Sequence, residues 1–308
     1  MVRSMRGNRR ALAVIVVAVG LALAAVSAAS GHPTRSSEQP KWILFTAQTG
    51  GLGGEQIFRI TSSGAGLKQL TKGAYPSEDP AFSPNGKRIA FARLGSGIFT
   101  MNVDGTGVRR LTTNGRDGFP AWSPNGAQIA FKRPTPNGWA VYVMSASGAG
   151  QRRLPQAPSA GRPSWTARGL VIPTNGDLAK IDPRTGRVQK RFGALIDAMV
   201  GMDSTAVAPD LSTLTYVGSR APIPGDKGCG EGVPCPVFAL YIQNVRQHKA
   251  PRLLVRDAGP ATFSRDGKSL LFVNKGRIVF WTLKNGGSRS IATGKLLPST
   301  SAPPAWQP

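Results

Sequence analysis

Five acidic residues are the first candidates for chemistry, because each precedes a short apolar segment that recurs along the chain. They are Glu78, Asp79, Asp117, Asp203 and Asp257. Calcium binds several carboxylate oxygens at one site, so acids brought together from these positions could hold it. The alternative is that they cap turns and pair with arginines. Arg116 and Arg162 come from equivalent segments and could neutralise such a group. Calcium apart, we expect no cofactor.

The two cysteines, Cys229 and Cys235, lie in a segment rich in glycine and proline, residues 221–236. In an oxidising compartment we expect them to form a local disulfide that stiffens this segment. Structural zinc takes four ligands, and His248 is the only histidine nearby, so a metal site at these thiols is disfavoured. The charged residues of the segment make it a candidate binding loop: Asp226, Lys227 and Glu231.

Support for enzymatic catalysis by side chains alone is poor. A Ser-His-Asp triad needs a histidine to move the proton, and after residue 40 the chain offers only His248. The G-x-S-x-G motif that carries the nucleophile of α/β-hydrolases does not occur. These residues favour a protein that is not an enzyme.

The candidate residues must be positioned by a repeat of roughly 40 residues. Residues 80–93 read PAFSPNGKRIAFAR and residues 120–133 read PAWSPNGAQIAFKR, and weaker copies begin at 163, 206 and 261. Each copy reads as a strand, a turn and a second strand with alternating apolar residues. A second strand–turn–strand module follows each copy, as in GIFTMNVDGTGVRRLT at 97–112. Two hairpins give four strands per repeat, which is a propeller blade.

The ends of the chain complete the repeat count. PPAWQP (303–308) and KWILFTA (41–47) are the two halves of a sixth first hairpin. We therefore predict an all-β fold, a six-bladed β-propeller with four-stranded antiparallel blades, closed by pairing of its N- and C-terminal strands in one blade. Segment 221–236 is then an inserted loop. We expect the large residues of the innermost strands to pack between blades: Phe82, Trp122, Trp165, Phe263 and Trp306.

The repeats resemble those of the TolB-type propeller family, also described as PD40 or WD40-like repeats. That family's pattern is close to P-x-W-S-P-D-G-x-x-I-A-F followed by I-Y-V-M-N-x-D-G and L-T. The resemblance covers about residues 41–308 and is strongest over 55–155. It implies the propeller fold but not a function, because the same repeats occur in the Tol envelope protein, in propellers that cap serine peptidases and in exported proteins without assigned roles. It implies neither a Tol-system role nor peptidase activity, because the domains that accompany the propeller in those proteins are not seen in this sequence.

The first 29 residues have the composition of a secretory signal peptide. Four arginines within residues 3–10 precede an apolar run over 11–26, and small residues follow at 27–30. An uncleaved membrane anchor is the alternative, because the apolar run approaches the ~20 residues that span a bilayer. Residues 30–40 then form a linker to the propeller. We expect an exported protein that is periplasmic, at the cell surface or secreted.

The chain is strongly basic, with a formal net charge of +24, and loss of the four leader arginines leaves +20. Such a charge attracts polyanions. The alternative is that dispersed lysines and arginines only keep the protein soluble, and the lack of a dense basic run in the mature chain favours it. Patterns typical of nucleic-acid binding are missing, so we expect no nucleic acid. The expected partner is an envelope or extracellular protein, or an anionic wall polymer. Membrane contact is expected only through an uncleaved leader, and the protein is expected to be a monomer.

Two principal functions remain open at this point, and adhesion to anionic wall polymers through the +20 charge is a third possibility. The first is a non-enzymatic exported binding or scaffold protein of the TolB-like propeller type. The second is a metal-dependent hydrolase of the lactonase kind, with its ion in the central channel held by the five acidic residues named first.

Overall fold

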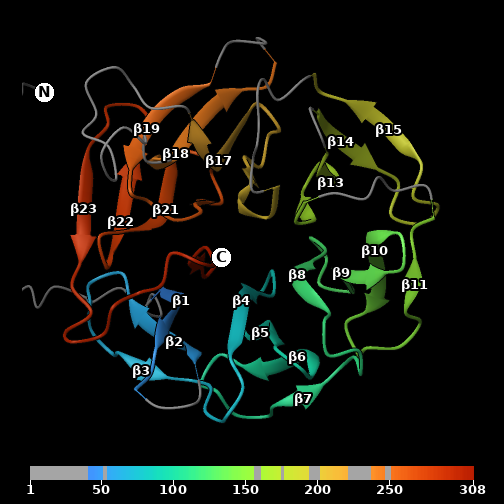
Figure 1. Ribbon diagram of the computed structural model, residues 1–308, viewed down its shortest axis with the longest axis horizontal. Helices are drawn as coiled ribbons and strands as arrows, with labels where there is room; N and C mark the ends of the chain where they lie inside the picture. Colours follow the sequence, from blue (N-terminus) through green and yellow to red (C-terminus); the bar gives the residue numbers. More distant parts are fainter. Residues whose placement is uncertain are drawn as a thin grey trace, which may run out of the picture. The chain divides into compact units, whose positions relative to one another are not determined.

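The computed structural model describes residues 41–50, 54–155, 161–174, 177–193, 202–220, 237–246 and 251–308. These residues form 24 β-strands in six four-stranded sheets. The strand pairings among the described residues are antiparallel. In each sheet a strand pairs with the next one along the chain, and in one sheet β24 also pairs with β1. The sheets are arranged as the blades of a propeller (Figure 1), which confirms the predicted fold.

The first strand of each blade lies innermost and the last outermost (Figure 1). Blade 1 consists of β24 (Ala305–Trp306), β1 (Trp42–Gln48), β2 (Glu55–Thr61) and β3 (Lys68–Gln69). Blade 2 consists of β4 (Ser77–Phe82), β5 (Arg88–Arg93), β6 (Gly97–Asn102) and β7 (Arg109–Arg110). Blade 3 consists of β8 (Gly118–Trp122), β9 (Gln128–Thr135), β10 (Gly138–Ser145) and β11 (Arg152–Arg153).

The remaining blades follow the same plan. Blade 4 consists of β12 (Ser164–Thr166), β13 (Gly169–Thr174), β14 (Asp177–Ile181) and β15 (Val188–Arg191). Blade 5 consists of a 3-10 turn, η1 (Met202–Ser204), and then β16 (Ala206–Val207), β17 (Thr213–Arg220), β18 (Val237–Asn244) and β19 (Arg252–Arg256). Blade 6 consists of β20 (Thr262–Phe263), β21 (Ser269–Asn274), β22 (Arg277–Thr282) and β23 (Ser288–Ile291).

The two ends of the propeller meet in blade 1, as predicted. Strand β24 pairs with β1 in the register Ile43↔Trp306 and Leu44↔Ala305. Gln307 extends this pairing, because its backbone N–H donates to the Trp42 carbonyl at 2.9 Å and its side-chain oxygen accepts from the Trp42 N–H at 2.9 Å. The closure satisfies an edge of the blade that would otherwise be unpaired.

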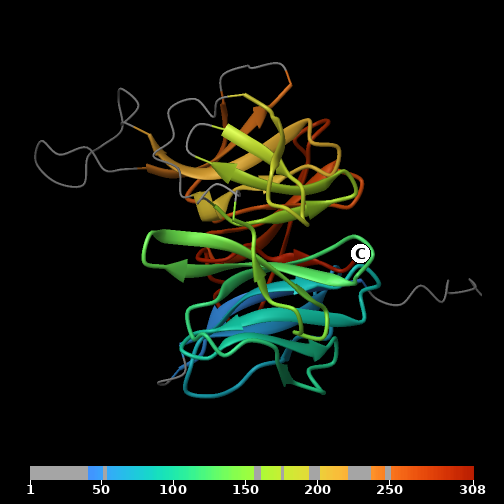
Figure 2. The same ribbon diagram turned by 90° about the vertical axis from the view of Figure 1, so that its right-hand side faces the viewer.

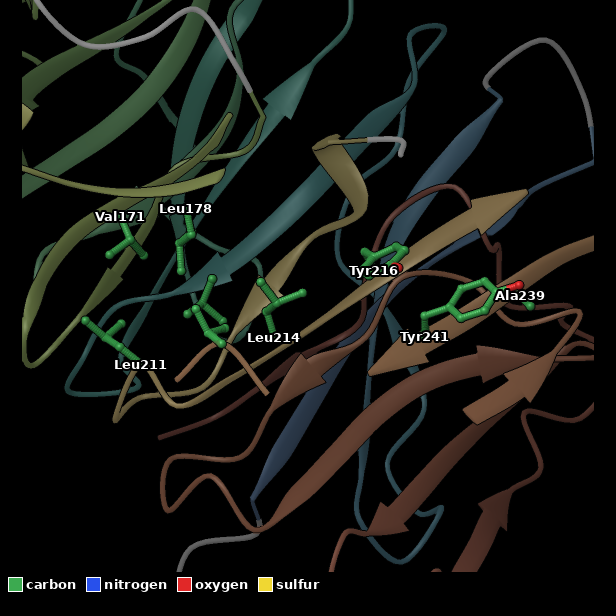
Figure 3. Packing of buried hydrophobic residues seen from close by; sticks show 9 residues of the cluster. Val171, Leu178, Leu211, Leu214, Tyr216, Ala239 and Tyr241 are labelled. Atoms are coloured by element: carbon green, nitrogen blue, oxygen red, sulfur yellow. The ribbon is translucent and has the colours of Figure 1, made fainter. Parts of the chain in front are cut away.

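The hydrophobic core is divided among the interfaces between blades. Buried apolar side chains of the described residues form six clusters, and each cluster joins two adjacent blades. Figure 3 shows one of them, in which Val171 and Leu178 of blade 4 face Leu211 and Leu214 of blade 5. Successive residues of a strand point to opposite faces, so alternate residues serve the two neighbouring blades.

The aromatic residues of the innermost strands lie at these interfaces, as predicted. Phe82, Trp122 and Phe263 are each 8% exposed. The Trp122 indole N–H donates to the Ala81 carbonyl of blade 2 at 3.2 Å. Trp306 donates in the same way to Thr262 of blade 6 at 3.3 Å. These bonds tie blade 3 to blade 2 and blade 1 to blade 6. Trp165 holds the equivalent place in blade 4, but its indole N–H has no acceptor among the described residues.

Candidate functional site

The residues singled out by their chemistry lie at one end of the ring, which we call the proximal end. It is defined as the end at which the first strand of each blade begins. Because the second strand runs antiparallel to the first, the turn between the second and third strands lies at this end too. The β17–β18 pair ends here with Arg220↔Val237, so insertion 221–236 is attached to the proximal end.

An ion pair crosses the ring between blades 2 and 4. Asp79 on β4 is bonded to Arg162, which lies two residues before β12. The Asp79 carboxylate also accepts the backbone N–H of Phe119, on β8 of the intervening blade, at 3.3 Å. The Asp79 side chain is 9% exposed and that of Arg162 is 17% exposed. Three successive blades therefore meet at one carboxylate near the ring axis.

A second ion pair connects blades 3 and 5. Lys132 on β9 is bonded to Asp203 in η1. The Lys132 ammonium lies 4.9 Å from the ring centroids of both Phe119 and Trp139. The Lys132 side chain is 3% exposed, whereas that of Asp203 is 43% exposed. Desolvated cations over aromatic faces are attracted by the ring quadrupole, which explains how a lysine is held at so buried a position.

Phe119 joins the two ion pairs into one group. Its ring centroid also lies 5.2 Å from the Arg162 guanidinium carbon, so both cations contact the same ring. We call this group the axial cluster. It contains two acids, two bases and two aromatic residues drawn from four consecutive blades: Asp79, Phe119, Lys132, Trp139, Arg162 and Asp203.

The axial cluster perturbs its ionisable groups. Burial raises the pKa of Asp79, and the Arg162 guanidinium and the Phe119 N–H oppose that rise. Burial lowers the pKa of Lys132, while the hydrogen bond from Lys132 to Asp203 opposes the fall. Glu78, next to Asp79, also has a raised pKa because of burial, followed by repulsion from Asp79 and Glu55. Ionisable groups whose pKa values are shifted by burial and by neighbouring charges are common at functional sites.

The five predicted calcium ligands are placed differently from one another. Asp79 and Asp203 belong to the axial cluster. Asp117 is 3% exposed and receives two bonds of 2.7 Å from Arg133. Asp257 is exposed and adopts a left-handed backbone, with φ 56°. Within the described residues no three histidine, cysteine or acidic side chains gather as a metal site would require. The alternative of carboxylate–cation pairing therefore describes three of the five acids.

The arginine expectations had different outcomes. Arg162 does neutralise an acid, as expected. Arg116 is exposed, and its backbone N–H closes a turn on the Asn114 side chain at 3.0 Å. Cys229, Cys235 and the candidate loop residues Asp226, Lys227 and Glu231 lie outside the described residues. Their disulfide and their binding role stay predictions.

Sequence reasoning missed three members of the axial cluster: Phe119, Lys132 and Trp139. One signal was available for Lys132. It stands 40 residues after Ala92, in IAFKR against IAFAR, at a position that the alternation of apolar residues assigns to the interior. A lysine at an interior position is rare unless it is paired, so this single departure from the repeat pointed to a buried ion pair.

Six four-stranded antiparallel blades around an axis define the class of this protein as a six-bladed β-propeller. Residues 20–168 match the family model described as TolB beta propeller domain. The matched part, slightly less than half of the chain, carries the TolB-type repeat, and the whole ring resembles TolB-type propellers in fold. No curated protein matches the sequence.

Solved structures resemble the chain in fold at low sequence identity. TolB from Acinetobacter baumannii superposes with a TM-score of 0.62 at 16% identity, covering 87% of this chain and 67% of that one. A chain of the nidogen/laminin complex gives a TM-score of 0.61 at 13% identity, covering 86% and 98%. A putative TolB from Agrobacterium tumefaciens gives 0.50 at 15% identity, covering 82% and 88%. Identities this low show a shared fold and no shared chemistry. Among the described residues no helix has the length and hydropathy to cross a bilayer.

Proposed function

We propose that this protein is a non-enzymatic, exported binding protein whose partner docks at the proximal end of the ring over the axial cluster. The partner class is a protein or polymer of the cell envelope or of the extracellular space. The observation that carries the proposal is the pair of cross-ring ion pairs, Asp79–Arg162 and Lys132–Asp203.

These ion pairs are poorly explained as devices for stability. Desolvation of buried charges offsets much of their mutual attraction, and replacing such pairs with apolar residues is often neutral or stabilising. Apolar clusters at the same interfaces already hold neighbouring blades together without these ion pairs. Retaining four charges near the axis is better explained by recognition, for which fixed charges supply specificity.

The axial cluster offers a partner several groups at once. Asp203 is 43% exposed, and Phe119 and Trp139 are half-buried. Two exposed apolar side chains, Tyr75 at 58% and Leu94 at 55%, lie in neighbouring turns at the proximal end. Aromatic anchors beside fixed charges are typical of energetically important positions in protein interfaces. This combination favours a protein segment carrying both charged and apolar groups.

The test is capture of the partner from envelope extract of the source organism by immobilised protein. Lys132→Met removes one charge but keeps a long apolar chain between the two aromatic rings. The Asp203 carboxylate that loses its partner is 43% exposed and can be solvated, so the ring is expected to stay folded. We expect at least tenfold less captured partner, because deleting one member of a desolvated charge pair in an interface typically costs ~2–5 kcal/mol.

Lys180→Met is the matched control. Lys180 is a half-buried strand lysine of blade 4 outside the axial cluster, and its variant should capture as much partner as the unaltered protein. Equal capture by the Lys132→Met variant would contradict the proposal. Deleting residues 222–236 tests separately whether the insertion contributes to the same surface.

Two further measurements separate this proposal from the hydrolase alternative and examine export. Elemental analysis of purified protein is expected to find no stoichiometric divalent ion, and a bound calcium ion would favour the metal-dependent hydrolase. N-terminal sequencing of protein recovered from outside the cytoplasm should begin after Ala28 or Ala29, as the leader pattern predicts. Recovery with Met1 intact would favour an uncleaved anchor.

A further inference from the structure

The outermost strands of the blades carry basic residues and no acidic ones. The six strands β3, β7, β11, β15, β19 and β23 lie at the periphery of the ring (Figure 1). Together they contain ten lysines and arginines and no aspartate or glutamate. We call these ten residues the basic rim: Lys68, Arg109, Arg110, Arg152, Arg153, Lys190, Arg191, Arg252, Arg256 and Arg289. Each blade contributes at least one of them.

Several rim side chains reach from one blade to the next. The Lys68 ammonium donates to the Asp104 carbonyl of blade 2 at 2.9 Å. Arg152 donates to the Arg184 carbonyl of blade 4 at 2.7 Å. Arg289 donates to the Ser62 carbonyl of blade 1 at 2.8 Å. A carbonyl fixes the position of a cation but does not neutralise it, so these bonds hold positive charge in place along the circumference. Arg191 differs, because it forms an ion pair with Asp177 at 2.9 Å.

Structural roles account for only part of the basic rim. Charged residues on edge strands prevent pairing with other chains, but acids would serve that purpose equally well. Bonding to carbonyls requires donors, yet the side chains of Arg109, Arg153 and Arg252 are exposed and make no hydrogen bond or ion pair in the part of the chain that is described. A single sign of charge on all six outer strands is explained instead by an anionic ligand.

The placement of the charges selects the kind of ligand. They follow the curved edge of the ring through all six blades (Figure 1). A flat anionic surface such as a membrane meets only one arc of that edge, whereas a flexible chain can follow it. Arginine, the commonest rim residue, has a planar guanidinium that matches phosphate oxygens in pairs.

We propose that the basic rim binds a flexible linear polymer of phosphate groups along the outer edge of the propeller. Figure 2 shows the ring from its side, the direction from which such a chain would approach. This inference rests on the polymer option of the proposed function. It does not depend on the axial cluster, because the basic rim lies on the outermost strand of each blade, far from the ring axis.

Long-chain inorganic polyphosphate is the probe, compared with tripolyphosphate and with vesicles of anionic phospholipid. The test variant carries Arg109→Gln, Arg153→Gln and Arg252→Gln. The control carries Lys72→Gln, Lys87→Gln and Lys268→Gln, three exposed residues that lie outside the outer strands. Both variants lose three positive charges, so net charge alone cannot distinguish them.

We expect long polyphosphate to bind the rim variant at least tenfold more weakly than the unaltered protein, and the control to change by less than about twofold. The slope of log affinity against log salt concentration should become shallower by roughly 2–3 in the rim variant, since each lost phosphate contact removes ~0.7–0.9. Tripolyphosphate should bind much more weakly, because it spans few blades.

Three results would overturn the inference. Equal loss in both variants would mean that net charge governs binding. Tight rim-dependent binding of vesicles without binding of polyphosphate would make a lipid surface the ligand. Equal affinity for long polyphosphate and tripolyphosphate would exclude a chain that follows the edge. The Lys132→Met variant should bind polyphosphate normally, so failure at the rim and failure at the axial cluster give different patterns.

Discussion

At the scale of single residues, two unfavourable backbone conformations build the axial cluster. Asp79 and Phe119 stand 40 residues apart at the same repeat position and both have left-handed backbones, with φ 52° and φ 57°. Each coincides with a register irregularity, between Glu78 and Ala81 in one strand and between Gly118 and Ala121 in the other. Aspartate tolerates this region, but a bulky residue such as phenylalanine rarely adopts it. Such conformations cost about 1–3 kcal/mol and are concentrated at functional sites.

Replacing Glu78 should reveal the cost of the carboxylates near the axis. Its pKa is raised from 4.5, first by burial, so the folded state favours the protonated form and ionisation destabilises the fold. Glu78→Gln should therefore raise the midpoint of thermal unfolding at pH 7. The gain should shrink as the pH falls and vanish below about pH 4.5, where the residue is protonated in both the folded and unfolded states. An equal gain at pH 7 and pH 3.5 would show that the carboxylate charge is not responsible.

The sequence predicts the residues of the axial cluster unevenly, for a physical reason. The acids and Arg162 could be named because they precede recurring strands. Trp139 could not, because it lies in the β9–β10 hairpin, whose strands have eight residues each against six in the equivalent β5–β6 hairpin. Its place over Lys132 depends on that lengthening, which has no counterpart in the preceding repeat. The sequence repeat shows which positions are equivalent in successive blades. It does not show which residues contact each other across two blades, as the ion pairs of the axial cluster do.

At the scale of elements, tight turns fix the hairpins, and the sequence foresees them well. In the Asn-Gly and Asp-Gly turns, Gly86, Gly126 and Gly267 have φ values of 67°, 70° and 71°. The serine before each pair bonds the Asn or Asp side chain at 2.6–2.8 Å. These contacts are local, so a single repeat contains all the information they need. The shortness of the outer strands, two residues in β3, β7 and β11, is not encoded so plainly.

Gly97, at the start of β6, should be irreplaceable for two independent reasons. Its φ is 108°, and an added Cβ would lie 2.8 Å from the backbone oxygens of Thr112 and Asn114. Gly97→Ala should lower the free energy of unfolding by roughly 1–3 kcal/mol through overpacking, in addition to the backbone penalty. Urea unfolding measures the loss.

The control for that prediction is Gly150→Ala. Gly150 also has a positive φ, 64°, but has nothing within 4 Å of an added Cβ. Its replacement should therefore cost only the backbone penalty of about 1–2 kcal/mol. If the two variants lose the same free energy of unfolding, the close approach of the Thr112 and Asn114 carbonyls to Gly97 does not contribute to the loss.

At the scale of the whole molecule, the ring is a closed cycle of similar interfaces. Each blade is held by an apolar cluster on either side, so opening one interface leaves two blades with an exposed face. The interface of blades 6 and 1 includes Trp306, whose ring packs edge-on against Phe280 at a centroid distance of 5.1 Å. β24 is the only strand of blade 1 that comes from the C-terminal end, and Pro298 and Ser299 add a bridge to Ala47 and a hydrogen bond to the Thr46 carbonyl.

Truncation after Ala302 should therefore destabilise the whole ring. It removes β24, the Trp306 side chain and the Gln307 contacts with Trp42. Trp306 is partly buried, and removal of a fully buried tryptophan typically costs about 3–5 kcal/mol; together with the lost strand pairing, this should lower the thermal midpoint sharply. A circular permutant tests whether the pairing itself, and not its place at the chain ends, holds the ring closed. It joins Pro308 to Lys41 through a short glycine-serine linker and opens the chain between Asp266 and Gly267. Strand β20 then becomes the last strand, and blade 6 is closed from both ends as blade 1 is now. Because β20 and β24 hold equivalent places in their sheets, the permutant should keep a thermal midpoint within a few degrees of the unaltered chain. A stable truncated protein, or a permutant as unstable as the truncation, would show that pairing across the chain ends is not what holds the ring closed.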